Sequence, residues 1–217
     1  QGVGPTEASF IPPLPHHIPE LLADWEHYVN EPTKQVVLWL ALSHYQFETI
    51  HPLLDGNGRV GRMLIELQLV AKGILPRPAL GISSYFQQHR TEYYLRLQDV
   101  RERGALNEWV SFFANAITER AQASRQMLLS YRALRSEFLT KLQQPELVDA
   151  LLRNPLPTVS RIMTELQVSQ PTASKYLAKA EAAGVIETLR RSGRGGKQQW
   201  VVTKAWAILQ ADQSAGQ

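Results

Sequence analysis

The sequence contains no cysteine among its 217 residues, which excludes disulfide bonds and metal sites built on thiolates. Long apolar runs are also missing: the longest has about seven residues, whereas a membrane-spanning helix needs roughly 18 to 20. The chain shows no export signal, so the sequence favours a cytoplasmic protein without a membrane partner. The histidines are scattered, and His16 and His17 have no partners at the spacing of metal ligands.

The formal net charge is small, +3, and unevenly placed. Residues 1–144 contain fourteen basic and fourteen acidic side chains, so the whole excess lies in residues 145–217, with nine basic and six acidic ones. With 44% hydrophobic residues, the chain can bury one or two cores. Composition therefore predicts one or two globular domains, with the basic excess in the last part of the chain.

The stretch richest in chemistry is 51–62, which reads His-Pro-Leu-Leu-Asp-Gly-Asn-Gly-Arg-Val-Gly-Arg. Before it, positions 37, 40, 41, 44 and 47 recur at helical spacing and predict a helix over about 33–49. After it, a second helical face ends at Gly73, with two prolines beyond; its members are Met63, Leu64, Leu67, Val70 and Ala71. The stretch therefore joins two helices.

Residues 56–61 match G-x-G-x-x-G, which in dinucleotide-binding folds follows a strand and precedes an acidic residue by about 20 positions. Neither condition holds, because the approach is helical and residues 76–80 read Pro-Arg-Pro-Ala-Leu. A P-loop also fails, since no Lys-Ser or Lys-Thr follows a suitably spaced glycine pair.

What these motifs share still applies: glycines let backbone amides approach an anion, and a helix N-terminus adds partial positive charge. Arg59 and Arg62 lie on one face at the start of the second helix, where cations are unfavourable unless an anion joins them. Asp55 is an oxygen ligand suited to Mg²⁺, and His51 titrates near neutrality, as a general base must. The alternative interpretation is a tight turn between helices, with Asp55 as a cap.

The stretch resembles the Fic family motif, H-x-F-x-[D/E]-G-N-G-R-x-x-R, and departs from it only at Leu53, where the family usually has Phe. The resemblance implies an all-helical domain that transfers AMP from ATP to a Ser, Thr or Tyr hydroxyl of a protein and releases pyrophosphate. His51 would deprotonate the hydroxyl, and Asp55 would hold Mg²⁺. The remaining nucleotide-binding residues would be Gly56, Asn57, Gly58, Arg59, Gly61 and Arg62, with Arg62 on the γ-phosphate.

The family's Phe is thought to anchor the loop in the core, so we expect Leu53 to anchor it with less contact area. Residues 10–22 resemble the segment leading from the family's target-docking flap into its core, which implies a flap remnant at 1–10 and a missing N-terminal part. The family's inhibitory motif, [S/T]-x-x-x-E-[G/N], has no match. Tyr93 and Tyr94 lie where the family places an aromatic pair near adenine; packing in the core is an equal alternative for each.

Beyond this region the sequence predicts a helix over 84–103 ending at Gly104, and a long helix from an Asn107 cap to about 143. Further helices are expected at 145–153, 158–166 and 170–183, followed by two β-runs at 185–189 and 200–203 around a basic, glycine-rich turn. This order resembles a winged helix-turn-helix. Candidate nucleic-acid contacts are Gln170, Thr172, Ser174, Lys175, Lys179, Arg190, Arg191, Arg194 and Lys197. Such domains also serve in dimerisation or protein docking, which stays an alternative.

We therefore predict a mainly α protein: a Fic-type catalytic domain (1–120), a linker helix (121–144), a small α+β winged-helix domain (145–210) and a tail (211–217). The predicted activity is ATP- and Mg²⁺-dependent AMP transfer to a protein target. Two alternatives are a DNA-binding transcriptional regulator that senses a nucleotide and a Fic-type transfer of another phosphate-containing group. Oligomeric state is left open, with a homodimer among the options.

Overall fold

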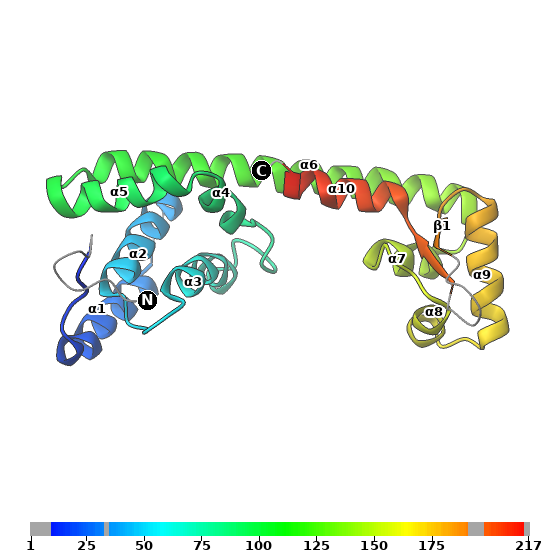
Figure 1. Ribbon diagram of the computed structural model, residues 1–217, viewed down its shortest axis with the longest axis horizontal. Coiled ribbons are helices and arrows are strands. Elements are labelled where there is room, and N and C mark those ends of the chain that lie inside the picture. The colour runs from blue at the N-terminus through cyan, green and yellow to red at the C-terminus, as the bar shows by residue number, and fades with distance from the viewer. Residues whose placement is uncertain (1–9, 33–34, 191–197, 215–217) are drawn as a thin grey trace. The chain divides into compact units, whose positions relative to one another are not determined.

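The computed structural model describes residues 10–32, 35–190 and 198–214 (Figure 1). The contacts divide the chain into two compact units, the first ending at Ser124 and the second beginning at Arg125. The division falls inside α6 (Leu106–Leu142), which also contains most of the predicted linker segment. Helices dominate both units and the described strands form one two-stranded sheet, which confirms the prediction of a mainly α protein.

Unit 1 is built from helices around α2, which packs against α1 and α3. Its elements before α6 are η1 (Pro15–His17), α1 (Ile18–Asn30), α2 (Val36–Ile50), α3 (Asn57–Ala71), α4 (Ile82–Gln88) and α5 (Arg90–Arg103). The centre of α2 is fully buried, and aromatic side chains from α4, α5 and α6 complete the core around it; they include Phe86, Tyr93, Trp109 and Phe113. This core supports the segment between α2 and α3, where the motif lies.

Two sequence predictions in this unit are corrected. The helix expected over 84–103 is two helices, because the chain leaves helical geometry at His89. The first of them begins two residues early, since the Glu66 carboxylate accepts the backbone N–H groups of Ala79, Leu80, Gly81 and Ile82 at 2.6–3.4 Å. A carboxylate there fixes the start of α4. Asn107, expected as a cap, lies inside α6.

Unit 2 has three short helices and a hairpin, namely α7 (Pro145–Arg153), α8 (Val159–Leu166), α9 (Gln170–Ala182), β1 (Glu187–Arg190) and β2 (Gln199–Val201), followed by α10 (Thr203–Ser214). The strands are antiparallel, with Thr188 opposite Trp200. Leu151, Ile162, Leu177 and Ile186 form the centre of an apolar core. The three predicted helices are confirmed within one residue at each end.

The end of unit 2 differs from the sequence prediction. We expected a strand to 203 and a tail over 211–217, but β2 ends at Val201 and α10 runs from Thr203 to Ser214. Ala205 in its first turn is fully buried, and the N–H of Trp206 donates to Val202 O at 2.9 Å. Burial of this turn selects helix over a longer strand, a tertiary effect that the short β-run cannot reveal.

Within the described ranges, none of the helices combines the length and apolar character that crossing a membrane requires.

Candidate nucleotide site and nucleic-acid interface

His51 closes α2 in a left-handed conformation, with φ of 51°, and its N–H donates to Phe47 O at 3.0 Å. Such a backbone is unfavourable for a residue with a Cβ, and it persists only where the surroundings fix it. The imidazole Nδ1 lies 3.4 Å from the carbonyl oxygen of Glu48. Because a carbonyl can only accept, Nδ1 carries the hydrogen. The lone pair is then on Nε2, which is the tautomer a general base requires.

The loop after His51 is held closed by Asn57 rather than by an apolar anchor. The Asn57 side chain accepts from Leu53 N at 2.8 Å and donates to Leu53 O at 2.6 Å, and it is buried. The Leu53 side chain itself is 41% exposed. Our expectation that Leu53 anchors the loop in the core is therefore wrong: two hydrogen bonds to the Leu53 backbone hold it, and these do not depend on the side chain at that position.

The first turn of α3 offers unpaired backbone donors beside two guanidinium groups. Gly56, at φ of 86°, precedes the helix, and no side chain caps its N-terminus. The Arg59 guanidinium lies over Gly56, 3.4 Å from where a Cβ would be, and that of Arg62 comes within 3.0 Å of the same point on Gly58. Glycines let both arginines fold back over the loop backbone. The arrangement is suited to an anion.

Asp55 is 92% exposed and its carboxylate forms an ion pair with Arg59 at 3.2 Å. Across the described residues there is no group of three or more His, Asp or Glu side chains arranged to hold a metal. Magnesium usually takes only one or two carboxylates and completes its shell with water and substrate phosphates. A single accessible carboxylate beside an anion-binding turn fits that mode, and it does not fit a cage made by protein alone.

Arg62 and both predicted tyrosines line one cavity of about 290 Å³, together with Ser83, Phe86, Gln87 and Arg90. The two tyrosines differ in environment. Tyr93 is buried, with its hydroxyl 3.0 Å from His44 Nε2, whereas Tyr94 is 54% exposed and its ring faces the Arg90 guanidinium at 5.7 Å. Of the pair, Tyr94 is therefore the ring available to a ligand, and Tyr93 belongs to the core. His51 and Asp55 are not part of the described cavity lining.

Sequence reasoning missed two titratable side chains buried beneath the loop. Burial lowers the pKa of His44 to about 3, so its imidazole is neutral, and burial raises the pKa of Glu48. The 3.9 Å contact between them therefore joins a carboxyl group to a neutral ring. Their spacing of four residues on the buried face of α2 is the signal that could have identified them.

Arg101 of α5, also missed, connects the surroundings of His51. Its Nη2 donates to the same Glu48 carbonyl at 3.3 Å, and its guanidinium stacks on Phe10 at 3.7 Å. The Phe10 ring meets His51 edge to face, with centroids 6.1 Å apart. The predicted flap-to-core segment thus contacts the candidate base through Phe10. Residues 1–9, the rest of the flap prediction, lie outside the described residues.

In unit 2 the predicted recognition helix is α9, and Gln170, Ser174 and Lys175 are exposed on it. The Thr172 hydroxyl contacts Ser169 Oγ at 3.0 Å. Lys179 donates to the carbonyl of Leu142 at 2.7 Å, so this cation already has a partner inside unit 2.

The wing predictions are only partly covered. Arg190 is the last residue of β1, while Arg191, Arg194 and Lys197 lie outside the described residues.

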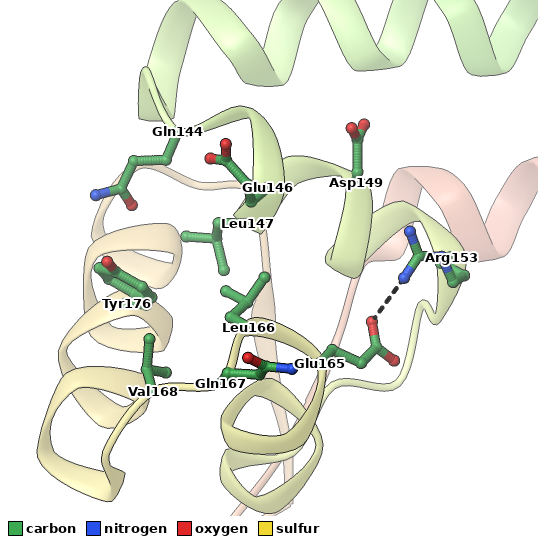
Figure 2. Close-up of a pocket in the computed structure, with 10 residues that line it drawn as sticks. All are labelled: Gln144, Glu146, Leu147, Asp149, Arg153, Glu165, Leu166, Gln167, Val168 and Tyr176. Carbon is green, nitrogen blue, oxygen red and sulfur yellow. Dashed lines mark hydrogen bonds and ion pairs between the residues drawn. The ribbon is translucent and has the colours of Figure 1, made fainter.

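Two cavities border the helices of unit 2. Figure 2 shows the first, of about 530 Å³, where Leu147 and Leu166 lie between Tyr176 on one side and the Arg153–Glu165 ion pair, at 3.3 Å, on the other. The second, of about 560 Å³, lies at the start of α8 and reaches Gln170 and Gln198. The first residue of α9 and the residue before β2 therefore border the same cavity.

Comparison with known proteins found matches in both units of the chain. Residues 2–69 match the model of the Fic/DOC family, and residues 143–188 match that of the bacterial regulatory proteins of the arsR family. A probable protein adenylyltransferase of Aquifex aeolicus is 45% identical over 69 residues, covering 31% of this chain and 22% of the relative. The protein adenylyltransferase Fic of Aedes aegypti is 36% identical over 115 residues, covering 51% and 21%.

The matched region thus spans about a fifth of the length of these relatives. A solved Fic family protein from Desulfovibrio desulfuricans aligns with 25% identity and a TM-score of 0.48, over 88% of this chain and 56% of its own. Residues 2–69 are thus similar to the Fic/DOC family, and residues 143–188 are similar to the regulatory proteins of the arsR family.

Proposed function

We propose that unit 1 transfers AMP from ATP to a Ser, Thr or Tyr hydroxyl of a protein. The observation that carries the proposal is the pairing of His51, held with its hydrogen on Nδ1, with an uncapped helix N-terminus covered by two arginines. The names of the curated relatives, all protein adenylyltransferases, support it. A tight interhelical turn would have no use for a positioned imidazole beside two folded-back cations.

In the proposed reaction, His51 Nε2 accepts the proton of the target hydroxyl as its oxygen attacks the α-phosphorus. A new P–O bond forms to the target, and the bond to the bridging oxygen breaks, so that pyrophosphate leaves with the electron pair. The N–H groups of Asn57 and Gly58 and the guanidinium groups of Arg59 and Arg62 would stabilise the charge on the phosphates. Gly56 would leave room for this approach, whereas the absent side chain of Gly61 leaves room for Glu48, His44 and Phe47 of α2.

Asp55 would hold Mg²⁺, which when bound offsets charge on the phosphate oxygens. To meet it, Asp55 must exchange its exposed ion pair with Arg59, which contributes little in water. We assign the cavity beside Arg62 to the nucleoside, with Tyr94 as the stacking ring. The domain limits of 1–120, 121–144, 145–210 and 211–217, the homodimer and the cytoplasmic location stay predictions.

The test is incubation of the full chain and a cell lysate with Mg²⁺ and ATP labelled at the α-phosphate. His51→Ala should reduce incorporation by about 10²- to 10⁴-fold, the usual contribution of a positioned general base. His16→Ala, which changes an exposed histidine of η1, is the matched control and should label as wild type. Equal labelling by His51→Ala would contradict the role of His51. In a parallel incubation with ATP labelled at the γ-phosphate, incorporation of that label would support transfer of another phosphate-containing group.

We also propose that unit 2 binds nucleic acid through α9, because the arsR-family match covers α7 to β1. Replacing Gln170, Ser174 and Lys175 with Ala should weaken binding to a DNA site, and replacing Arg190, Arg191 and Arg194 should also reduce the salt dependence. A gel shift at two salt concentrations measures both. If unit 2 binds DNA while His51→Ala changes no labelling, a nucleotide-sensing regulator becomes the better hypothesis.

A further inference from the structure

Glu48 lies directly beneath the candidate anion-binding turn. It is a residue of α2, and it is only 6% exposed. A Cβ added to Gly61 would come within 2.7 Å of Glu48 Oε1, and one added to Gly58 within 3.7 Å. The carboxyl group therefore occupies the space that a side chain at Gly61 would need, and it lies at van der Waals distance from the same point on Gly58. It lies behind the backbone that we assign to the phosphates.

The charges around Glu48 come from groups that also face the loop. Burial is the largest influence on Glu48 and raises the pKa of its carboxyl group, whereas the neighbouring guanidinium groups of Arg62 and Arg101 favour ionisation. Within the described residues, Oε1 has no hydrogen-bond donor. Of these two cations, Arg62 is also assigned to the phosphates, and together they do not outweigh burial, so the pKa of the carboxyl group stays above its usual value.

This placement is difficult to explain as a contribution to stability. A buried carboxylate with an unpaired oxygen is costly, and apolar residues of similar volume usually pack as well or better. The glycines at 58 and 61 leave room for Glu48 Oε1, but within the described residues this oxygen accepts no hydrogen bond. What the carboxylate does change is the electrostatic potential at the turn.

We infer that Glu48 sets the affinity of the loop for phosphate groups by offsetting the positive charge of Arg62 and Arg101, so that pyrophosphate is released after AMP transfer. The inference rests on the proposed function, because it assumes that the phosphates bind at the first turn of α3. A negative charge about 10 Å from a phosphate, at an effective dielectric constant of about 20, weakens binding by about tenfold. Without it the loop would retain its product.

The experiment measures binding of inorganic pyrophosphate to the full chain by calorimetry, with and without Mg²⁺. Glu48→Gln keeps the size of the side chain and removes its charge, so it should bind pyrophosphate about tenfold more tightly than wild type and show a lower KM for ATP. Glu108→Gln removes the same charge from an exposed position of α6 and should bind as wild type. Glu48→Met, which removes the charge without an amide, should follow Glu48→Gln.

Unchanged or weaker pyrophosphate binding in both Glu48 variants, with native circular dichroism, would overturn the inference. Tighter binding in Glu108→Gln as well would attribute the effect to net charge and would overturn it too. AMP transfer by wild type together with equal affinities would reject only the role of Glu48. Absence of both AMP transfer and pyrophosphate binding in wild type would reject the proposed function itself, and the inference with it.

Discussion

The two units differ in what they bury. Among the described residues, every buried polar or charged side chain belongs to unit 1: Ser43, His44, Glu48, Asn57, Gln68, Asp99 and Arg120. The core of unit 2 is apolar, and its ion pairs, such as Arg135–Asp149 at 2.6 Å, lie at the surface. A helix-turn-helix only has to present one face of a helix to its partner, so an apolar core is sufficient to hold it in place. Unit 1 instead buries polar and charged groups, and a buried charge lowers the stability of the unit that holds it unless it is well paired.

Glu66→Ala should have the largest effect on the difference between the two units. Its carboxylate accepts four backbone N–H groups before and in α4, two of them on buried residues. Loss of these bonds should destabilise unit 1 by about 3 kcal/mol, because buried donors are left unpaired. Hydrogen exchange read by peptide should show faster exchange in α3 and α4 and no change in α9. Glu66→Gln, which keeps an acceptor oxygen, should give a stability between those of wild type and Glu66→Ala. Equal loss of protection in units 1 and 2 would contradict the difference between the units.

The second-largest effect should be on the pH dependence of stability. Burial lowers the pKa of His44 to about 3, whereas histidine in an unfolded chain titrates near 6.5. The neutral ring is favoured in the fold, so its contribution is complete above about pH 6.5 and is lost as the pH falls toward 3. The loss should reach about 2 kcal/mol by pH 5. The raised pKa of Glu48 acts in the opposite direction, since protonation of that carboxyl is favoured in the fold.

Urea titrations at pH 7, 6 and 5 would measure the pH dependence of the free energy of unfolding. Proteolytic peptides from α2 would report the unfolding of unit 1, and peptides from α9 that of unit 2. His44→Gln should flatten the pH dependence of α2 and leave that of α9 unchanged. Parallel curves for wild type and the variant would show that His44 is not the source of the acid sensitivity.

The smallest expected effect is in unit 2. Lys179→Met removes the bond to the carbonyl of Leu142 at the end of α6 and keeps most of the apolar stem. We expect a loss of about 1 kcal/mol in unit 2, the usual net contribution of one hydrogen bond. Affinity for DNA should change less than in Lys175→Met, which alters an exposed cation of the same helix. A larger effect of Lys179→Met on DNA affinity would restore Lys179 as a contact.

Local patterns allowed much of this protein to be predicted. The helices around the motif follow from apolar spacing, and α7, α8 and α9 follow from the prolines between them and a glycine stop. The start of α4 did not, because Glu66 is sixteen residues away from the last N–H it binds. The helix α10 was also missed, since burial of Ala205 depends on the rest of unit 2.

The sequence by itself determined the chemistry of the loop: an imidazole, a carboxylate, glycines and two arginines in an order that matches one family. Only the tertiary structure decided how those groups are held. It placed the hydrogen of His51 on Nδ1 through the Glu48 carbonyl, closed the loop through Asn57 and not Leu53, and put the charge of Glu48 under Gly58 and Gly61. The reason is physical: residue types fix which protons and charges are available, whereas tautomer, burial and charge balance depend on neighbours brought together by folding.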